Sequence, residues 1–260
     1  MATSGRRRGG RRLGRVLAWI AGSLLALVVV GLVAREVSPW PSALLVRMAF
    51  DAGGRQANDA LFGRVPPGVQ SLVDEPYLVD EPVAKLDVHW PTAPAADPRG
   101  RPAIIWFHGG AFLSGSKAQL VNYLRILAAE GYVVVAPDYG LAPGTHYPQA
   151  LRQALAAVAH VARHAPRLGI DPSRIFVAGD SAGAQLAAQL AIVRDDPAYA
   201  RAVGVDLPPG LPALRGTILF CGPHDLRLVD FDGAFGGFME TVLWSYFGRR
   251  DFHADPRLST

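Results

Sequence analysis

From residue 102 onward, short uninterrupted apolar runs alternate with stretches of helical periodicity. Four runs have the length of strands, at 103–107, 132–136, 175–178 and 217–221. Because they are apolar throughout, both faces of each strand should be buried. Helical patterns lie between them at 119–130, 148–165 and 182–193. This alternation predicts an α/β fold, with a mostly parallel sheet covered by helices on both faces.

An uncharged segment of 19 residues, 16–34, precedes this region. At about 1.5 Å per residue it spans most of a bilayer core of about 30 Å. Residues 1–15 contain six arginines and no acid, which places the N-terminus in the cytoplasm by the positive-inside rule. The sequence thus predicts a basic cytoplasmic tail at 1–15 and a single-pass transmembrane helix at 16–34, with the rest extracytoplasmic. The alternative is a cleaved signal peptide, whose apolar stretch is shorter, about 7–15 residues.

Composition and charge exclude several classes of protein. Half of the 260 residues are hydrophobic and 18% are charged, which excludes a disordered chain. The single cysteine excludes an intrachain disulfide. The net charge is +4, but without the six arginines of the tail the remaining residues sum to −2. The body of the protein has no basic surplus, so no nucleic-acid partner is expected.

The residues between the apolar segment and the first strand-like stretch are expected to form a helical connector or cap, 35–75. Apolar residues at helical spacing predict a helix over 40–61, which Gly53 and Gly54 should interrupt. A strand-like stretch follows between Pro76 and Pro91. The α/β domain is therefore expected to cover 76–260.

Residues 179–183, Gly-Asp-Ser-Ala-Gly, stand between a predicted strand and a predicted helix. This context is that of a nucleophile elbow, a sharp turn that lifts a serine side chain above the sheet. Gly179 and Gly183 are needed there because side chains would collide with the neighbouring strand and helix. The dipole of the following helix favours negative charge at its N-terminus. Ser181 is the candidate nucleophile, and Gly179, Asp180 and Gly183 support the motif.

A second motif, His108-Gly109-Gly110, follows the predicted strand 103–107. In this kind of site, N–H donors to a tetrahedral intermediate come from the residue after the nucleophile and from the loop after an earlier strand. Glycines let the backbone approach the intermediate closely. The candidate oxyanion donors are the N–H groups of Gly109, Gly110 and Ala182. His108 is expected to order this loop and not to act as the base, because it precedes the nucleophile.

Together these segments resemble the hormone-sensitive-lipase-like branch of the α/β-hydrolases, also called the fold-3 group. The resemblance covers about residues 75–260. Four segments carry it: HGGAF (108–112), DYGLAPGTHYPQAL (138–151), DPSRIFVAGDSAGAQLA (171–187) and ILFCGPHDL (218–226). It implies a serine carboxylesterase that acts on small acyl esters and needs no cofactor. The chain departs from the family pattern at Ala111, which should change loop stiffness only mildly, and at Gly140 and Gly144, which are expected to loosen the loop beneath the site.

A serine of this kind needs a base for its proton and an acid to orient that base. The resemblance places the acid after one further strand and the histidine after the strand that follows it, whereas residues 226–260 contain no strand-like apolar run. We therefore expect the last two strands and both triad partners to be absent from this sequence. A compact substitute, Ser181 with Asp225 and His253, has a workable order in the chain. Against it, Asp225 lies in an ordinary turn and His253 in a polar tail.

The leading hypothesis is a membrane-anchored serine esterase or lipase-like hydrolase of small acyl esters. The alternatives are an inactive hydrolase-like module that binds a lipid or acyl ligand at the membrane, and a peptidase, against which the glycine loop argues. No metal site is expected, because His160 and His164 are spaced like ligands but lack a third one. Helices at 40–61 and 226–250 are expected to shape the pocket. The sequence predicts neither the acyl and alcohol specificity nor an oligomeric state.

Overall fold

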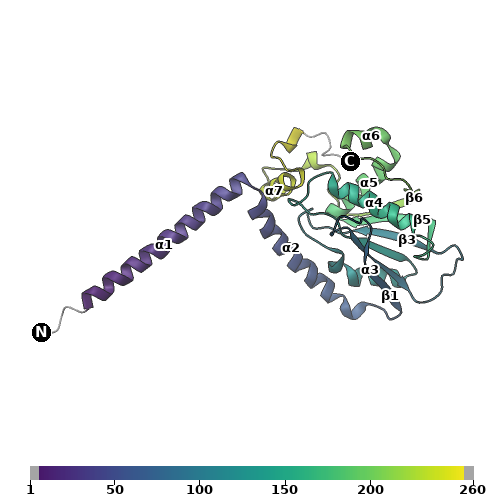
Figure 1. Ribbon diagram of the computed structural model, residues 1–260, viewed down its shortest axis with the longest axis horizontal. Coiled ribbons are helices and arrows are strands. Elements are labelled where there is room, and N and C mark those ends of the chain that lie inside the picture. Colours follow the sequence, from purple (N-terminus) through teal and green to yellow (C-terminus); the bar gives the residue numbers. More distant parts are fainter. Residues whose placement is uncertain (1–5, 255–260) are drawn as a thin grey trace. The chain divides into compact units, whose positions relative to one another are not determined.

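The computed structural model describes residues 6–254 (Figure 1). Its chain divides into two compact units, Met1–Ser42 and Ala43–Thr260. The first unit consists mainly of helix α1 (Arg6–Val37). Within it, Arg15–Val37 has a mean hydropathy of 2.6 and is unburied, so by length and composition it could cross a membrane or serve as a signal sequence. Of the expected basic tail, residues 1–5 lie outside the described residues.

Helix α2 (Trp40–Ala60) matches the predicted helix over 40–61. The expected interruption at Gly53 and Gly54 is wrong, because the helix continues through both residues. Gly54 packs against the side chain of Gln119, where a Cβ atom would come closer than 3.0 Å, whereas nothing lies within 4 Å of a Cβ built at Gly53. In this intact helix, Gly54 therefore allows close packing and Gly53 leaves open space.

The six strands form one sheet in the order β1-β2-β4-β3-β5-β6. Their bounds are Val69–Pro76, Lys85–Pro91, Arg101–Phe107, Val133–Pro137, Ile170–Asp180 and Leu214–Phe220, from β1 to β6. The pairs β1/β2 and β2/β4 are antiparallel and the other three are parallel. The mostly parallel sheet is as predicted. Strand β1 was not predicted, since all of it but Pro76 lies in the segment 35–75 that was expected to be helical. Its polar sequence contains no apolar run.

Helices cover both faces of the sheet (Figure 1). They are α3 (Val121–Ala129), α4 (Gln149–Arg163), α5 (Ala182–Asp195), α6 (Pro197–Val203) and α7 (Gly236–Phe247). Alternate residues of β3 separate into two cores, as the period of a strand requires. Ile105 packs in the larger core with α4 and α5, and Ile104 in the smaller core with Leu124 of α3. The two buried faces predicted from the apolar runs are confirmed for this strand.

Strand β6 differs from that expectation. Ile218, Leu219 and Phe220 are exposed by 36%, 37% and 50%, and Cys221 is exposed as well. The strand is outermost among those described and pairs only with β5. A continuous apolar run indicated burial on both faces, but it carries no information about which strands flank it.

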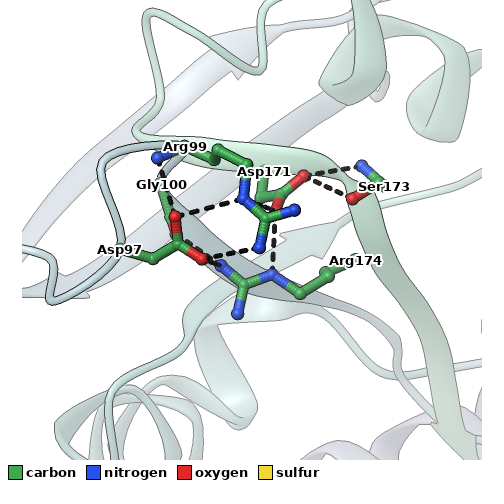
Figure 2. A network of polar contacts seen from close by, with 6 residues as sticks. All are labelled: Asp97, Arg99, Gly100, Asp171, Ser173 and Arg174. Atoms are coloured by element: carbon green, nitrogen blue, oxygen red, sulfur yellow. Dashed lines mark hydrogen bonds and ion pairs between the residues drawn. The ribbon is translucent and has the colours of Figure 1, made fainter.

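A polar network lies at the amino ends of the parallel strands (Figure 2). Arg174 of β5 contacts Asp171 at 2.9 Å and Asp97 at 3.2 Å, and donates to the Gly100 carbonyl at 2.7 Å. It joins the segment before β3 to the start of β5, at the end of these strands opposite Ser181. We call this group of residues (Asp97, Arg99, Gly100, Asp171, Ser173 and Arg174) the amino-end clasp.

His89 is a buried titratable group in β2. Its Nδ1 shares a hydrogen bond of 2.7 Å with the Ser71 hydroxyl, and within residues 6–254 its Nε2 has no hydrogen-bond partner. Burial lowers the pKa of His89 from 6.5 to about 4. The folded protein therefore holds this imidazole in its neutral form.

This burial predicts a specific acid sensitivity. Between pH 6.5 and about 4, the His89 imidazole is protonated in the unfolded chain but stays neutral in the folded protein. As the pH falls through this range, the free energy of unfolding should therefore decrease by up to about 1.4 kcal/mol per pH unit. In His89→Asn the amide group can still share a hydrogen bond with Ser71, and this part of the pH dependence should disappear. Denaturant unfolding of both proteins at pH 7, 6 and 5 measures it; equal slopes against pH would contradict the assignment.

Candidate active site

Ser181 joins β5 to α5 in a strained backbone conformation, with φ +50° and ψ −118°. Such a conformation costs about 1–3 kcal/mol and persists only where the surroundings enforce it. Here the Ser181 N–H donates to the Phe220 carbonyl of β6 at 2.8 Å, and the Ser181 carbonyl accepts from the Gln185 N–H at 3.1 Å. Both neighbouring elements therefore fix the turn.

The glycines on either side of Ser181 stand where no side chain fits. A Cβ at Gly179 would approach the backbone of Gly183 closer than 3.0 Å, and one at Gly183 would approach the carbonyls of Phe107 and His108 in the same way. The collisions with helix and strand that the sequence led us to expect are thus present. They also bring the first turn of α5 against the end of β3.

The glycine loop contacts this turn directly. A Cβ at Gly109 would clash with the Asp180 carboxylate, whose Oδ1 accepts from the Trp106 indole at 3.1 Å. Gly110 has φ +120° and packs against Ser114, leaving no room for a side chain. Its carbonyl accepts from the N–H groups of Leu113 and Ser114, both at 3.0 Å. These bonds fold residues 108–116, the oxyanion loop, into a compact turn beside Ser181.

Three backbone N–H groups face no acceptor in the part of the chain that the structure describes. Those of Gly109, Gly110 and Ala182 donate to no other described residue. Ala182 is the first residue of α5, where the helix dipole and unpaired N–H groups favour an anion. These are the three donors that the sequence singled out.

His108 is buried and committed to the loop. Its ring stacks on Tyr139 with centroids 4.3 Å apart, and its Nδ1 donates to the Gly109 carbonyl at 2.8 Å. The Tyr139 hydroxyl donates to the His108 carbonyl at 2.5 Å. Burial lowers the pKa of His108 and raises that of Asp138, 3.8 Å away. These contacts hold the ring against the loop, and the loop-ordering role of His108 stays a prediction.

Two departures from the family pattern behave differently from expectation. Ala111 and Phe112 have φ +56° and +60°, a left-handed region that costs a residue with a side chain about 1–2 kcal/mol. The effect of Ala111 is therefore not mild. Gly140 does not loosen its loop either: its N–H donates to Gln153 at 2.6 Å, and a Cβ would lie 2.7 Å from the Thr145 hydroxyl.

A cavity of about 400 Å³ opens beside the oxyanion loop. One wall is the face of α2 that carries Phe50, Gly53 and Ala57; the other is formed by Gly109, Gly110 and Asp180. Phe50 also stacks on Phe238 of α7, with ring centroids 5.9 Å apart. No lysine or arginine lines the cavity. It suits an uncharged group held next to Gly109 and Gly110, two of the three candidate oxyanion donors.

The compact substitute triad does not assemble. Asp225 pairs with Arg227 at 2.7 Å and 2.8 Å, and the His253 ring packs on Phe252 and Phe231. Among residues 6–254, no hydrogen bond or ion pair joins Ser181 to either of them. The described residues also contain no group of three potential metal ligands.

Several residues that hold the site were not found from the sequence. On α2, Arg47 donates to the Leu113 carbonyl at 2.5 Å and to the Ala142 carbonyl at 2.9 Å. Asp51, one turn further, accepts from the Gly115 N–H at 3.1 Å. The available signal was their spacing, since both charges lie on the side of α2 that includes the buried Ala43.

Comparison with known proteins agrees with this fold. A family model described as the alpha/beta hydrolase fold matches residues 104–234. Human hormone-sensitive lipase is 37% identical over 125 residues, which are 48% of this chain and 11% of that protein. Esterase LipI of Mycobacterium tuberculosis is 39% identical over 117 residues, 44% of this chain and 36% of that protein. The chain thus spans well under half the length of these relatives.

Among solved structures, the carboxylesterase EstE1 from a metagenomic library superposes with a TM-score of 0.60 and 28% identity, covering 85% of this chain and 73% of that one. Esterase B from Lactobacillus rhamnosis gives 0.68 at 22% identity, over 84% and 67% of the two chains, and so supports the fold alone. With half of its length matched by the family model, the chain belongs to the α/β-hydrolases, in their hormone-sensitive-lipase-like branch.

Proposed function

We propose that this protein is a membrane-anchored hydrolase of small, uncharged carboxylic esters that works through an acyl-enzyme on Ser181. The observation that carries the proposal is the strained serine beside three N–H groups without acceptors among the described residues. Relatives named as esterases and lipases support ester bonds as the target. The cavity without cationic lining supports a neutral substrate.

The reaction follows from this arrangement. The Ser181 hydroxyl oxygen attacks the ester carbonyl carbon, and the N–H groups of Gly109, Gly110 and Ala182 stabilise the oxyanion. The tetrahedral intermediate collapses, the alcohol leaves with a proton, and the acyl group stays on Ser181. Water then attacks the acyl-enzyme and the carboxylic acid departs. Asp180 keeps anionic substrates away from the cavity.

Both steps require a base for the serine or water proton. Within residues 6–254 no histidine hydrogen bonds to Ser181. We infer that the described part supplies the nucleophile and the oxyanion donors, and that Asp225 and His253 do not supply the base and its acid. The same observation favours the second candidate, an inactive module that binds an acyl or lipid ligand in the cavity.

Helix α1 is proposed to anchor the protein with its N-terminus in the cytoplasm and the hydrolase domain on the other side. Its support is the unburied apolar segment Arg15–Val37 and the arginines that precede it.

The nucleophile is tested by Ser181→Ala. Because the acyl-enzyme can no longer form, covalent labelling of residue 181 by a fluorophosphonate should disappear, and any hydrolysis of a short-chain p-nitrophenyl ester above the residual rate that binding and oxyanion donors sustain should be lost. The control Ser173→Ala changes a serine at the other end of β5 and should keep the parental rate. A Ser181→Ala protein that turns over the ester at a near-normal rate would exclude Ser181.

Because no base hydrogen bonds to Ser181 within residues 6–254, we expect a slow reaction. The 260-residue chain by itself should hydrolyse the ester about 10⁴–10⁶ times more slowly than hydrolases with a complete triad, and it should label poorly with a fluorophosphonate. His253→Ala should change neither measurement. Stoichiometric labelling of Ser181 that disappears in His253→Ala would refute this and establish the compact triad. Undetectable hydrolysis with retained binding of an acyl ligand would favour the inactive module.

The anchor is tested by fractionation. The intact chain should stay with membranes through an alkaline carbonate wash, because a spanning helix is held by the hydrocarbon core and not by charge. Mass spectrometry of the fraction should find the N-terminal residues still present. A soluble protein shortened near residue 35 would mean that the segment is a cleaved signal peptide.

A further inference from the structure

Lys117 is a buried cation directly after the oxyanion loop. It is only 9% exposed, and lysines are rarely buried unless they are paired. Its Nζ lies 2.6 Å from Asp87 Oδ1 and 2.7 Å from Asp74 Oδ1. Asp87 is itself 5% exposed. The contact therefore joins the end of the loop to two carboxylates that precede it by 30 and 43 residues.

Those carboxylates belong to the antiparallel strands β1 and β2. Asp74 has φ +57° and lies at a register shift between Leu72 and Glu75, where β1 bulges. Bulges redirect side chains. The Asp74 N–H donates to Asp87 at 2.9 Å, on the same oxygen that contacts Lys117. Asp74 and Asp87 thus bind the Lys117 ammonium group together.

The backbone of Lys117 makes a second connection. Its N–H donates to Asp138 Oδ1 at 2.7 Å, and the same oxygen lies 3.8 Å from His108 Nε2. Two residues earlier, Gly115 packs so closely on Gly109 and His108 that a Cβ would clash with both. A displacement of Lys117 would therefore be transmitted through Gly115 to the Gly109 backbone.

We infer that Lys117 is a positioning residue, which fixes the N–H groups of Gly109 and Gly110 by tying the oxyanion loop to Asp74, Asp87 and Asp138. This inference rests on the proposed role of those N–H groups. Buried ion pairs are weak contributors to stability, because desolvation offsets their attraction. They do fix geometry, and oxyanion donors act only when held close to the developing charge.

The test variant removes the ion pair without leaving a buried charge. Lys117→Met alone would leave the buried Asp87 carboxylate without a cation and destabilise the fold. The variant therefore combines Lys117→Met with Asp87→Asn, whose amide oxygen still accepts from the Asp74 N–H. The matched control is Arg174→Met with Asp171→Asn in the amino-end clasp. It also removes a cation and its buried carboxylate, since the Asp171 side chain is 3% exposed, but at the opposite end of the strands.

The first measurement is amide hydrogen exchange of the full chain in detergent. Exchange in peptides covering 108–116 should rise about tenfold or more in the Lys117 variant, through local opening, while peptides from β5 stay protected. The control should leave 108–116 unchanged. Unchanged exchange in 108–116, or an equal rise in both variants, would overturn the inference.

The second measurement is the rate at which Ser181 reacts with a fluorophosphonate or a p-nitrophenyl ester. The Lys117 variant should lose about tenfold or more in that rate with little change in KM, because the donors act mainly in the transition state. An unchanged rate beside faster exchange would reduce Lys117 to a purely structural residue. If Ser181 reacts in none of the proteins, the proposed function fails, and the exchange pattern alone decides whether Lys117 holds the loop.

Discussion

The backbone strain at Ser181 is the constraint on which the site depends. A serine with φ +50° relaxes unless its neighbours prevent it. Two contacts do so: the hydrogen bond to the Phe220 carbonyl of β6, and the packing of Gly183 on the end of β3. Strands β3 and β6 therefore do more than bury apolar area, because their contacts with this turn determine where the hydroxyl group can be.

The oxyanion loop contains no helix or strand, so its conformation depends on contacts with other segments. Contacts from three directions hold it. Arg47 and Asp51 reach it from α2, Tyr139 from the segment after β4, and Lys117 carries it to the antiparallel edge. Ala111 and Phe112 have left-handed backbone conformations. These contacts, together with the stacking of Phe112 on Tyr246, stabilise that conformation.

How far the sequence predicted the molecule depends on the range of each interaction. The buried strands and the serine turn follow from patterns a few residues long, so they could be predicted. Strand β1 could not, because its polar residues acquire a partner only once β2 lies beside them. The pairing of Lys117 with Asp74 and Asp87 could not be predicted either, since the two carboxylates are distant from Lys117 in the chain. The motif singled out Gly109 and Gly110 as candidate oxyanion donors, which remains a prediction. The strain at Ala111 and Phe112 was not predicted, because neither residue type signals a left-handed backbone.

The glycine at position 53 has a consequence for how such a protein could diversify. A glycine inside a helix gives up about 1 kcal/mol relative to alanine, and at Gly53 no atom within 4 Å forbids a side chain. The residue lies on the wall of the cavity. At position 53, the stability of helix α2 and the volume of the cavity therefore depend on the same side chain. A mutation there to a residue of high helix propensity, such as alanine or leucine, strengthens α2 while it narrows the cavity, so the volume of the cavity can change without a loss of helix stability.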